Sequence, residues 1–285
     1  MRIQILFVCL YLVCFSEKSL AQRHKELTDN VEVFKNIPYV TYGDRTLLLD
    51  IYKPQETTIE KLPAILVIRG GGWQKGDKEG YATIAAALTA KGFAAVCIEY
   101  RTAQEALFPA AVFDTKNALQ WIKTNADKYG IDANKIGAIG GSAGAHLALL
   151  LGVSADVEAL NPESENADYS LQAVVALASP TNFHATWGPK HWLGKPFGES
   201  QETWRLASPV THIDSNSPPA LLIHSSNDKV VDYSHSILAL EKYGEAGVHC
   251  DLDLIPDAAH AFWFSEKWFD YTIGKSVAFF QEYLK

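Results

Sequence analysis

The chain has 285 residues, of which 48% are hydrophobic and 20% are charged, and its formal net charge is −8. This composition is typical of a compact globular protein and argues against a disordered or fibrous chain. The negative net charge, without a basic patch in the sequence, argues against binding to nucleic acid.

The N-terminal segment has the pattern of a secretory signal peptide. Arg2 precedes an apolar run from Ile3 to Phe15, and a polar stretch ends at Ala21. A membrane anchor is the alternative, but the run is shorter than the roughly 20 residues that span a bilayer. We expect a signal peptide over residues 1–21, cleaved after Ala21, and a secreted or periplasmic protein without stable membrane association.

Strand-like and helical patterns then alternate along one domain, residues 22–285, which no linker divides. Short apolar runs typical of strands occur at 46–52, 64–69, 93–98, 136–140, 172–178, 220–225 and 249–255. Helices are expected at 79–91, 109–127, 142–152, 232–246 and 266–284. The alternation predicts the α/β class, with a mostly parallel central sheet flanked by helices.

A glycine-rich loop follows the second predicted strand. It reads Gly70-Gly71-Gly72-Trp73, and such a loop can turn backbone N–H groups toward a negative oxygen that forms during attack on a carbonyl carbon. A phosphate-binding loop is the rival interpretation. That loop requires a G-K-[ST] ending, whereas Lys75 lies beyond a tryptophan and a glutamine. We expect oxyanion donors among Gly71, Gly72 and Trp73.

Ser142 lies in the sequence Gly140-Gly141-Ser142-Ala143-Gly144, between a predicted strand and a predicted helix. The pattern G-x-S-x-G in this context is typical of a nucleophile elbow, where larger flanking residues would collide with the backbone. The alternative is that the glycines only allow a strand to turn into a helix. We expect Ser142 to be a nucleophile and the N–H of Ala143 to be a further oxyanion donor.

A serine nucleophile needs a histidine that takes its proton and a carboxylate that orients the histidine. Asp228 lies in the loop after the sixth predicted strand, and His260 is the histidine that follows the last strand. Asp232 and Asp257 are alternatives for the acid, although Asp232 more naturally caps the helix that begins there. We expect Asp228 and His260 to complete a catalytic triad with Ser142.

The interval 181–215 interrupts the alternation and is long for a connection, which indicates a lid-like insertion. Its aromatic and imidazole side chains include His184, Trp187, His191, Trp192 and Trp204. Flat indole faces can stack on sugar rings, and imidazoles can hydrogen-bond hydroxyl groups. We expect Trp187, Trp192 and His184 to contact substrate; the alternative is that the tryptophans only anchor the insertion.

Cysteine and histidine residues do not show the close spacing of zinc ligands, so no structural metal is implied. Cys9 and Cys14 belong to the signal peptide. Cys97 and Cys250 lie in strand-like runs and are expected to be buried free thiols. His146, just after the elbow, is expected to pack or to hydrogen-bond locally.

The segments LLLDIYKP, RGGGWQKGD, IEYR, FPAAVFDTKNALQWI, GIDANKIGAIGGSAGAHLA and HSSNDKVV, with His260, together resemble the α/β-hydrolase superfamily. The strongest resemblance is to secreted bacterial esterases similar to acetylxylan and feruloyl esterases, related to hormone-sensitive-lipase-like enzymes. It covers residues 36–284. It implies the α/β-hydrolase fold and the triad named above, and it implies no metal or cofactor. The chain departs from the family pattern at Arg69, which replaces a histidine, and at Ala259, which replaces a glycine.

The resemblance implies a serine carboxylic ester hydrolase that works through an acyl-enzyme. The expected substrate is a small-molecule or polysaccharide ester, from which a small acyl group such as acetyl or feruloyl is removed. An amidase, a small peptidase or a formamidase-like hydrolase with the same triad is the alternative enzyme. A binding protein on an inactive hydrolase scaffold is the alternative from another class.

Overall fold

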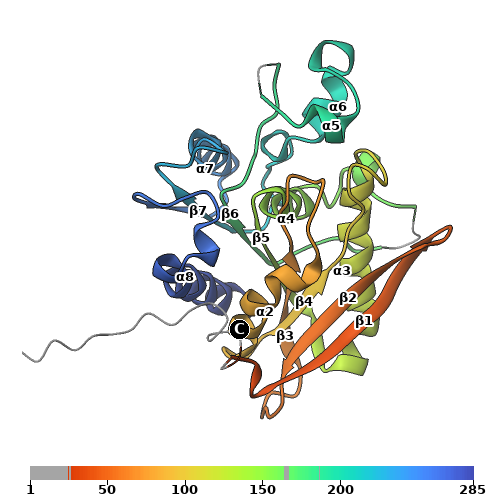
Figure 1. The fold of residues 1–285 in the computed structure, drawn as a ribbon, viewed down its shortest axis with the longest axis vertical. Helices are drawn as coiled ribbons and strands as arrows, with labels where there is room; N and C mark the ends of the chain where they lie inside the picture. Colours follow the sequence, from red (N-terminus) through yellow and green to blue (C-terminus); the bar gives the residue numbers. More distant parts are fainter. Residues whose placement is uncertain (1–24, 26, 164–166, 186) are drawn as a thin grey trace, which may run out of the picture.

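A mostly parallel sheet of eight strands forms the centre of the computed structural model (Figure 1). Residues 25, 27–163, 167–185 and 187–285 are described, so the predicted signal peptide, residues 1–21, lies outside them. The strand order is β1-β2-β4-β3-β5-β6-β7-β8. The strands are β1 (Val31–Tyr42), β2 (Arg45–Pro54), β3 (Leu62–Ile68), β4 (Ala94–Ile98), β5 (Ile131–Gly141), β6 (Ala173–Leu177), β7 (Ala220–Ser225) and β8 (Cys250–Ile255).

Strands β3 to β8 are mutually parallel, whereas β2 pairs antiparallel with β1 and β4. The predicted α/β class and mostly parallel sheet are therefore confirmed. Every residue of β3, β4 and β6 is buried. This burial explains why these strands appear in the sequence as continuous apolar runs, since a parallel sheet is covered on both faces.

The edge strand β1 was not predicted from the sequence. Its exposed and half-buried residues show no long apolar run, and Pro38 and a left-handed Asn36 interrupt it. The pairing with β2 shifts register near both positions. Proline is tolerated because an edge strand has one row of N–H groups without a strand partner.

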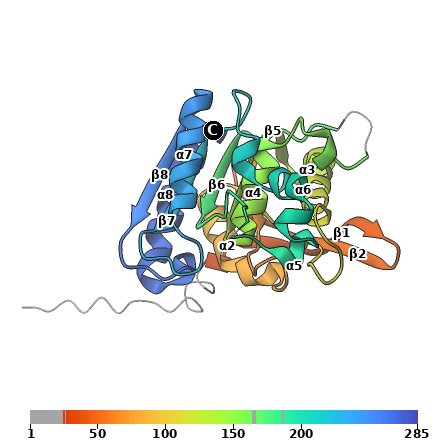
Figure 2. The same cartoon turned by 90° about the horizontal axis from the view of Figure 1, so that it is seen from above.

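Helices cover both faces of the sheet. They are α2 (Ala82–Thr89), α3 (Ala110–Tyr129), α4 (Ala143–Val153), α5 (Lys190–Leu193), α6 (Gln201–Leu206), α7 (Ser234–Ala246) and α8 (Glu266–Leu284). Side chains of α3, α4 and α7 share one apolar core, and those of α2 and α8 share a second. In Figure 2, α7 and α8 lie with β7 and β8 at one end, and the β1–β2 hairpin extends from the other.

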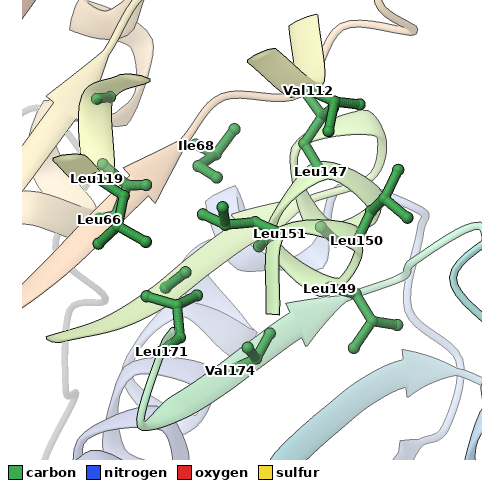
Figure 3. Close-up of a cluster of buried hydrophobic side chains, with 14 of the residues drawn as sticks. Leu66, Ile68, Val112, Leu119, Leu147, Leu149, Leu150, Leu151, Leu171 and Val174 are labelled. Carbon is green, nitrogen blue, oxygen red and sulfur yellow. The ribbon is translucent and has the colours of Figure 1, made fainter. Parts of the chain in front are cut away.

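Helix α4 lies in the middle of the first core. All of its residues are buried. Figure 3 shows leucines of α4 meeting side chains from β3, α3 and β6, among them Leu66, Val112 and Val174. This packing fixes the start of α4, and therefore the position of the residue that precedes it, Ser142.

The two cysteines in the described part of the chain, Cys97 and Cys250, differ in burial. Both are free thiols, and Cys97 is buried as expected. Cys250 is only half-buried, so the expectation of a buried thiol is wrong there, because it begins the edge strand β8.

Among the helices of the described ranges, none combines the length and apolar character that a membrane span requires.

Candidate active site

Ser142 occupies a sharp strand-to-helix turn. It follows β5 and precedes α4, and its φ of 57° and ψ of −122° are a strained combination for a residue with a Cβ. The turn is held on both sides. The N–H of Ser142 donates to Leu177 O over 2.8 Å, and its carbonyl accepts the N–H of His146 over 3.0 Å.

Neighbouring glycines make the turn possible because side chains have no room there. A Cβ on Gly140 would lie 2.3 Å from the carbonyl carbon of Gly144, and a Cβ on Gly144 would lie 2.1 Å from Ile68 O. At Gly141 it would lie 2.5 Å from the ring of Trp263. Close approach of backbone to backbone therefore explains Gly140 and Gly144, and close approach of the Trp263 ring explains Gly141.

His260 joins Ser142 to Asp228. Its Nε2 lies 2.8 Å from Ser142 Oγ, and its Nδ1 lies 2.7 Å from Asp228 Oδ2. Since a carboxylate can only accept, Nδ1 carries the proton, and Nε2 is free to accept the hydroxyl proton of Ser142. The three predicted residues therefore come together in the order that proton transfer from the serine requires.

Asp228 is held as a carboxylate. Burial acts to raise its pKa, but hydrogen bonds from His224 and His260 and from the N–H groups of Val230 and Val231 together lower the pKa well below its usual range. Neither alternative acid takes this place. Asp232 accepts the N–H of Ser234 at the start of α7, and Asp257 is an exposed loop residue.

The glycine loop after β3 forms a tight turn. Gly71 O accepts the N–H groups of Gln74 and Lys75, and both central residues, Gly72 and Trp73, have positive φ, the sign pattern of a type I′ turn. In a trans peptide the C=O and the next N–H point in opposite directions, so the N–H of Gly72 points away from this turn. The Gly70 N–H is already bonded to the Tyr81 hydroxyl.

Arg69 lies behind the loop, in place of the histidine of the family pattern. Its guanidinium is buried and donates to Lys75 O over 2.7 Å, to Tyr100 O over 3.1 Å and more distantly to Gly70 O over 3.4 Å. It also stacks on Tyr100, with Cζ 3.9 Å from the ring centre. Arg69 therefore binds the loop backbone rather than reaching into the pocket.

A pocket of about 520 Å³ opens at Ser142 and His260. It is lined by the glycine loop together with Tyr81, Val230, Trp263 and Phe264. None of these four residues was predicted from the sequence. The aromatic run that follows His260 was the available signal for Trp263 and Phe264, whereas Tyr81 and Val230 reach the pocket only through the fold.

The BD-FAE family model matches residues 49–243, which include the glycine loop, Ser142 and Asp228. The chain belongs to this family.

Relatives of this BD-FAE member include two esterases of Mycobacterium tuberculosis (strain ATCC 25618 / H37Rv). Esterase LipC is 32% identical over 67% of the chain and 51% of its own length, and Esterase LipQ is 32% identical over 80% and 56%. The chain thus spans about half the length of these relatives.

Solved structures extend the likeness across the α/β-hydrolase domain. A truncated carbohydrate esterase from gut microbiota has a TM-score of 0.77 at 27% identity, with 88% of this chain and 95% of that chain covered. An esterase of Thermogutta terrifontis phosphonylated by sarin has a TM-score of 0.78 at 25% identity, with 90% and 95% covered. The α/β-hydrolase fold predicted for this BD-FAE chain is thus confirmed.

The insertion of this BD-FAE chain packs its tryptophans more deeply than expected. Trp192 and Trp204 are fully buried, so neither offers a face to a sugar, and the expectation that Trp192 contacts substrate is contradicted. Trp187 is half-buried and stacks on Phe183, and His184 is exposed. His146 packs against Trp73 and Trp192, and its Nε2 bonds to Ala207 O, far along the chain, rather than locally.

Proposed function

We propose that this protein is a serine carboxylic ester hydrolase that works through an acyl-enzyme. The observation that carries the proposal is the continuous hydrogen-bonded relay from Ser142 through His260 to Asp228 at the mouth of the pocket. The relatives described as esterases support the same chemistry. Organophosphorus modification of a similar esterase supports a nucleophilic residue.

In the proposed first step, His260 Nε2 takes the proton of Ser142 Oγ while the oxygen attacks the ester carbonyl carbon. The carbonyl oxygen becomes negative and is stabilised by backbone N–H groups among Gly71, Gly72, Trp73 and Ala143. Ala143 suits this role because the first residue of a helix has no intrahelical acceptor for its N–H. The imidazolium then protonates the departing alcohol, which leaves an acyl-Ser142.

In the second step, water gives a proton to His260 and attacks the acyl carbon. Collapse of the second tetrahedral intermediate returns the proton to Ser142 Oγ and releases the acid. Asp228 keeps the imidazole oriented and stabilises its positive charge in both steps. No step requires a metal or another cofactor.

Replacing Ser142 by Ala tests the mechanism. We expect hydrolysis of p-nitrophenyl acetate to fall by several orders of magnitude with the melting temperature retained. A fluorophosphonate should add one adduct to the natural chain, on the peptide that contains Ser142. Full turnover by the variant, or no labelling, would refute the proposal; the latter is also what an inactive binding scaffold would give.

The proposed substrates are carbohydrate esters with small acyl groups, acetyl or feruloyl. The structural neighbour described as a carbohydrate esterase supports this class. A panel of acetyl, butyryl, octanoyl and feruloyl esters, on simple alcohols and on acetylated polysaccharide, would test acyl size and leaving group. A matched anilide separates an esterase from an amidase.

Trp187 and His184 are the proposed contacts of the insertion with the sugar. Trp187→Ala should raise KM for an acetylated oligosaccharide several-fold and leave p-nitrophenyl acetate hydrolysis unchanged. An equal loss on both substrates would show that Trp187 is a packing residue.

We also propose that the protein is exported and that its signal peptide, residues 1–21, is removed by cleavage after Ala21. Mass spectrometry of the protein recovered from its host should find a chain that begins at Gln22. An N-terminus that retains residues 1–21 would contradict it.

A further inference from the structure

We propose that helix α5 of the insertion holds the glycine loop after β3 in the conformation that stabilises the oxyanion, with His191 as a positioning residue. This inference rests on the proposed function, because it concerns the N–H donors of the same site. It gives the insertion a role in catalysis that is separate from substrate contact.

The backbone of the glycine loop is strained at Trp73. Trp73 has a φ of +59°, a conformation that a residue with a bulky side chain rarely adopts. A Gly-Trp pair at the centre of a two-residue turn favours the type II′ form, in which only the glycine has positive φ. The two forms differ by a flip of the peptide between Gly72 and Trp73. The observed form is therefore the one that the local sequence disfavours.

Helix α5 contacts both central residues of this turn. His191 Nε2 lies 3.0 Å from Gly72 O, and because a carbonyl can only accept, the imidazole donates. Trp192 stacks on Trp73, with ring centres 5.0 Å apart and an interplanar angle of 15°. A peptide flip would turn Gly72 O away from His191 and remove this hydrogen bond.

Helix α5 is itself held in place by contacts with other parts of the chain. Trp192 is fully buried, and its carbonyl accepts the N–H of Phe108 over 2.9 Å. His146 on α4 packs edge-on against both Trp73 and Trp192. Strained backbone persists where surrounding structure holds it, and here the surrounding structure comes from the insertion and from α4, the helix that follows Ser142.

The consequence concerns the transition state. If the Gly72–Trp73 peptide flips, the dipoles of the loop change direction close to the site where the oxyanion forms. Donors that are fixed in advance stabilise the developing charge, whereas a loop that must reorganise does so less well. Loss of His191 should therefore lower kcat while the binding of the neutral ester is unchanged.

The experiment compares His191→Leu with His191→Gln, whose amide N–H can replace the imidazole donor. The control is His249→Leu, an exposed histidine just before β8, at the edge of the sheet away from the pocket. For each variant, kcat and KM are measured on p-nitrophenyl acetate. The inhibition constant of a trifluoromethyl ketone, which becomes an anionic hemiketal when the serine adds, is measured as well.

We expect His191→Leu to lower kcat and to raise that inhibition constant, each about tenfold, with KM unchanged, as for partial loss of oxyanion stabilisation. His191→Gln and His249→Leu should behave as the natural chain. Unchanged kcat in His191→Leu, a rise in KM alone, or an equal loss in His191→Gln would overturn the proposal. If the natural chain and Ser142→Ala hydrolyse the ester equally, the proposed function fails instead.

Discussion

His260 Nδ1 donates to Asp228 Oδ2 over 2.7 Å, while the other oxygen of the same carboxylate accepts the backbone N–H groups of Val230 and Val231. The carboxylate cannot rotate without losing these bonds. Asp228 therefore fixes both the direction of the imidazole and the nitrogen that carries its proton. The loop after β7 thus contributes a fixed acceptor rather than a mobile side chain.

Replacing Asp228 by Asn should abolish most of the activity without unfolding the protein. An amide can donate to Nδ1 and so favour the tautomer that cannot take the proton of Ser142, which in serine hydrolases costs about 10⁴-fold in kcat. The measurement is p-nitrophenyl acetate turnover with circular dichroism as the check on folding. Asp232→Asn and Asp257→Asn serve as controls, and a comparable loss in either would assign the acid elsewhere.

Arg69 should be sensitive even to a conservative change. Arg69→Lys keeps the charge but cannot bridge Lys75 O and Tyr100 O with one planar fork. We expect kcat to fall about tenfold, by the reasoning that applies to oxyanion donors, and Arg69→Met to fall further. Steady-state kinetics and thermal melting check both variants. Natural kcat in Arg69→Met would show that Arg69 has no part in positioning the loop.

Gly144 and Gly274 should respond in opposite ways to alanine. At Gly144 the new Cβ would lie 2.1 Å from Ile68 O, so the backbone must move and we expect a loss of more than about 3 kcal/mol in the free energy of unfolding. At Gly274, in α8, no atom other than the backbone of its own helix and its chain neighbours lies within 4 Å of the new Cβ. There we expect a gain of about 0.5–1 kcal/mol, as for alanine in a helix. Urea unfolding of both variants tests the contrast.

Two buried histidines should make the fold sensitive to mild acid. Burial lowers the pKa of His146 and of His235 to about 4. His235 Nδ1 also accepts the N–H groups of Thr181 and Asn182, an acceptor that protonation would remove. Because the folded pKa lies below the unfolded value of about 6.5, this stability is complete above pH 6.5 and declines as the pH falls toward 4.

The slope should reach about 1.2 kcal/mol per pH unit for each histidine between pH 6 and pH 4.5. Asp228 adds little in this window because most of its stabilisation is lost below the unfolded pKa of an aspartate, about 3.9. Urea unfolding at a series of pH values measures the slope. His146→Phe should reduce it by one histidine, and an unchanged slope would contradict the assignment.

The sequence predicted the elements whose signal is local. The runs that became β3, β4 and β6 are buried on both faces. The motif around Ser142 lies within one strand–turn–helix unit, although the contacts that require glycine at Gly141 and Gly144 come from Trp263 and Ile68, in other segments. The helix expected at 266–284 was found with the same bounds. The triad positions followed from the order of strands, because parallel strands end at a common edge.

The sequence could not predict features that depend on distant partners. Strand β1 forms because its backbone pairs with β2. The pattern of apolar and polar residues in β1 does not by itself indicate a strand. Trp192 has the flat aromatic side chain that is typical of a sugar-binding residue, but the residues that pack around it, Trp73 and His146, come from segments far away in the chain. The sequence shows that a residue has an aromatic side chain, but whether that side chain is buried depends on the fold.

The parallel arrangement of the strands also determines where the protein can be attached to a solid support without blocking its pocket. Ser142, Asp228, His260 and the glycine loop all follow strand ends, whereas the turn at residues 247–249 precedes β8 and lies at the opposite edge. Gly247 and His249 are exposed there. A coupling group introduced at this turn would fix the protein to a solid support with its pocket directed toward the solution.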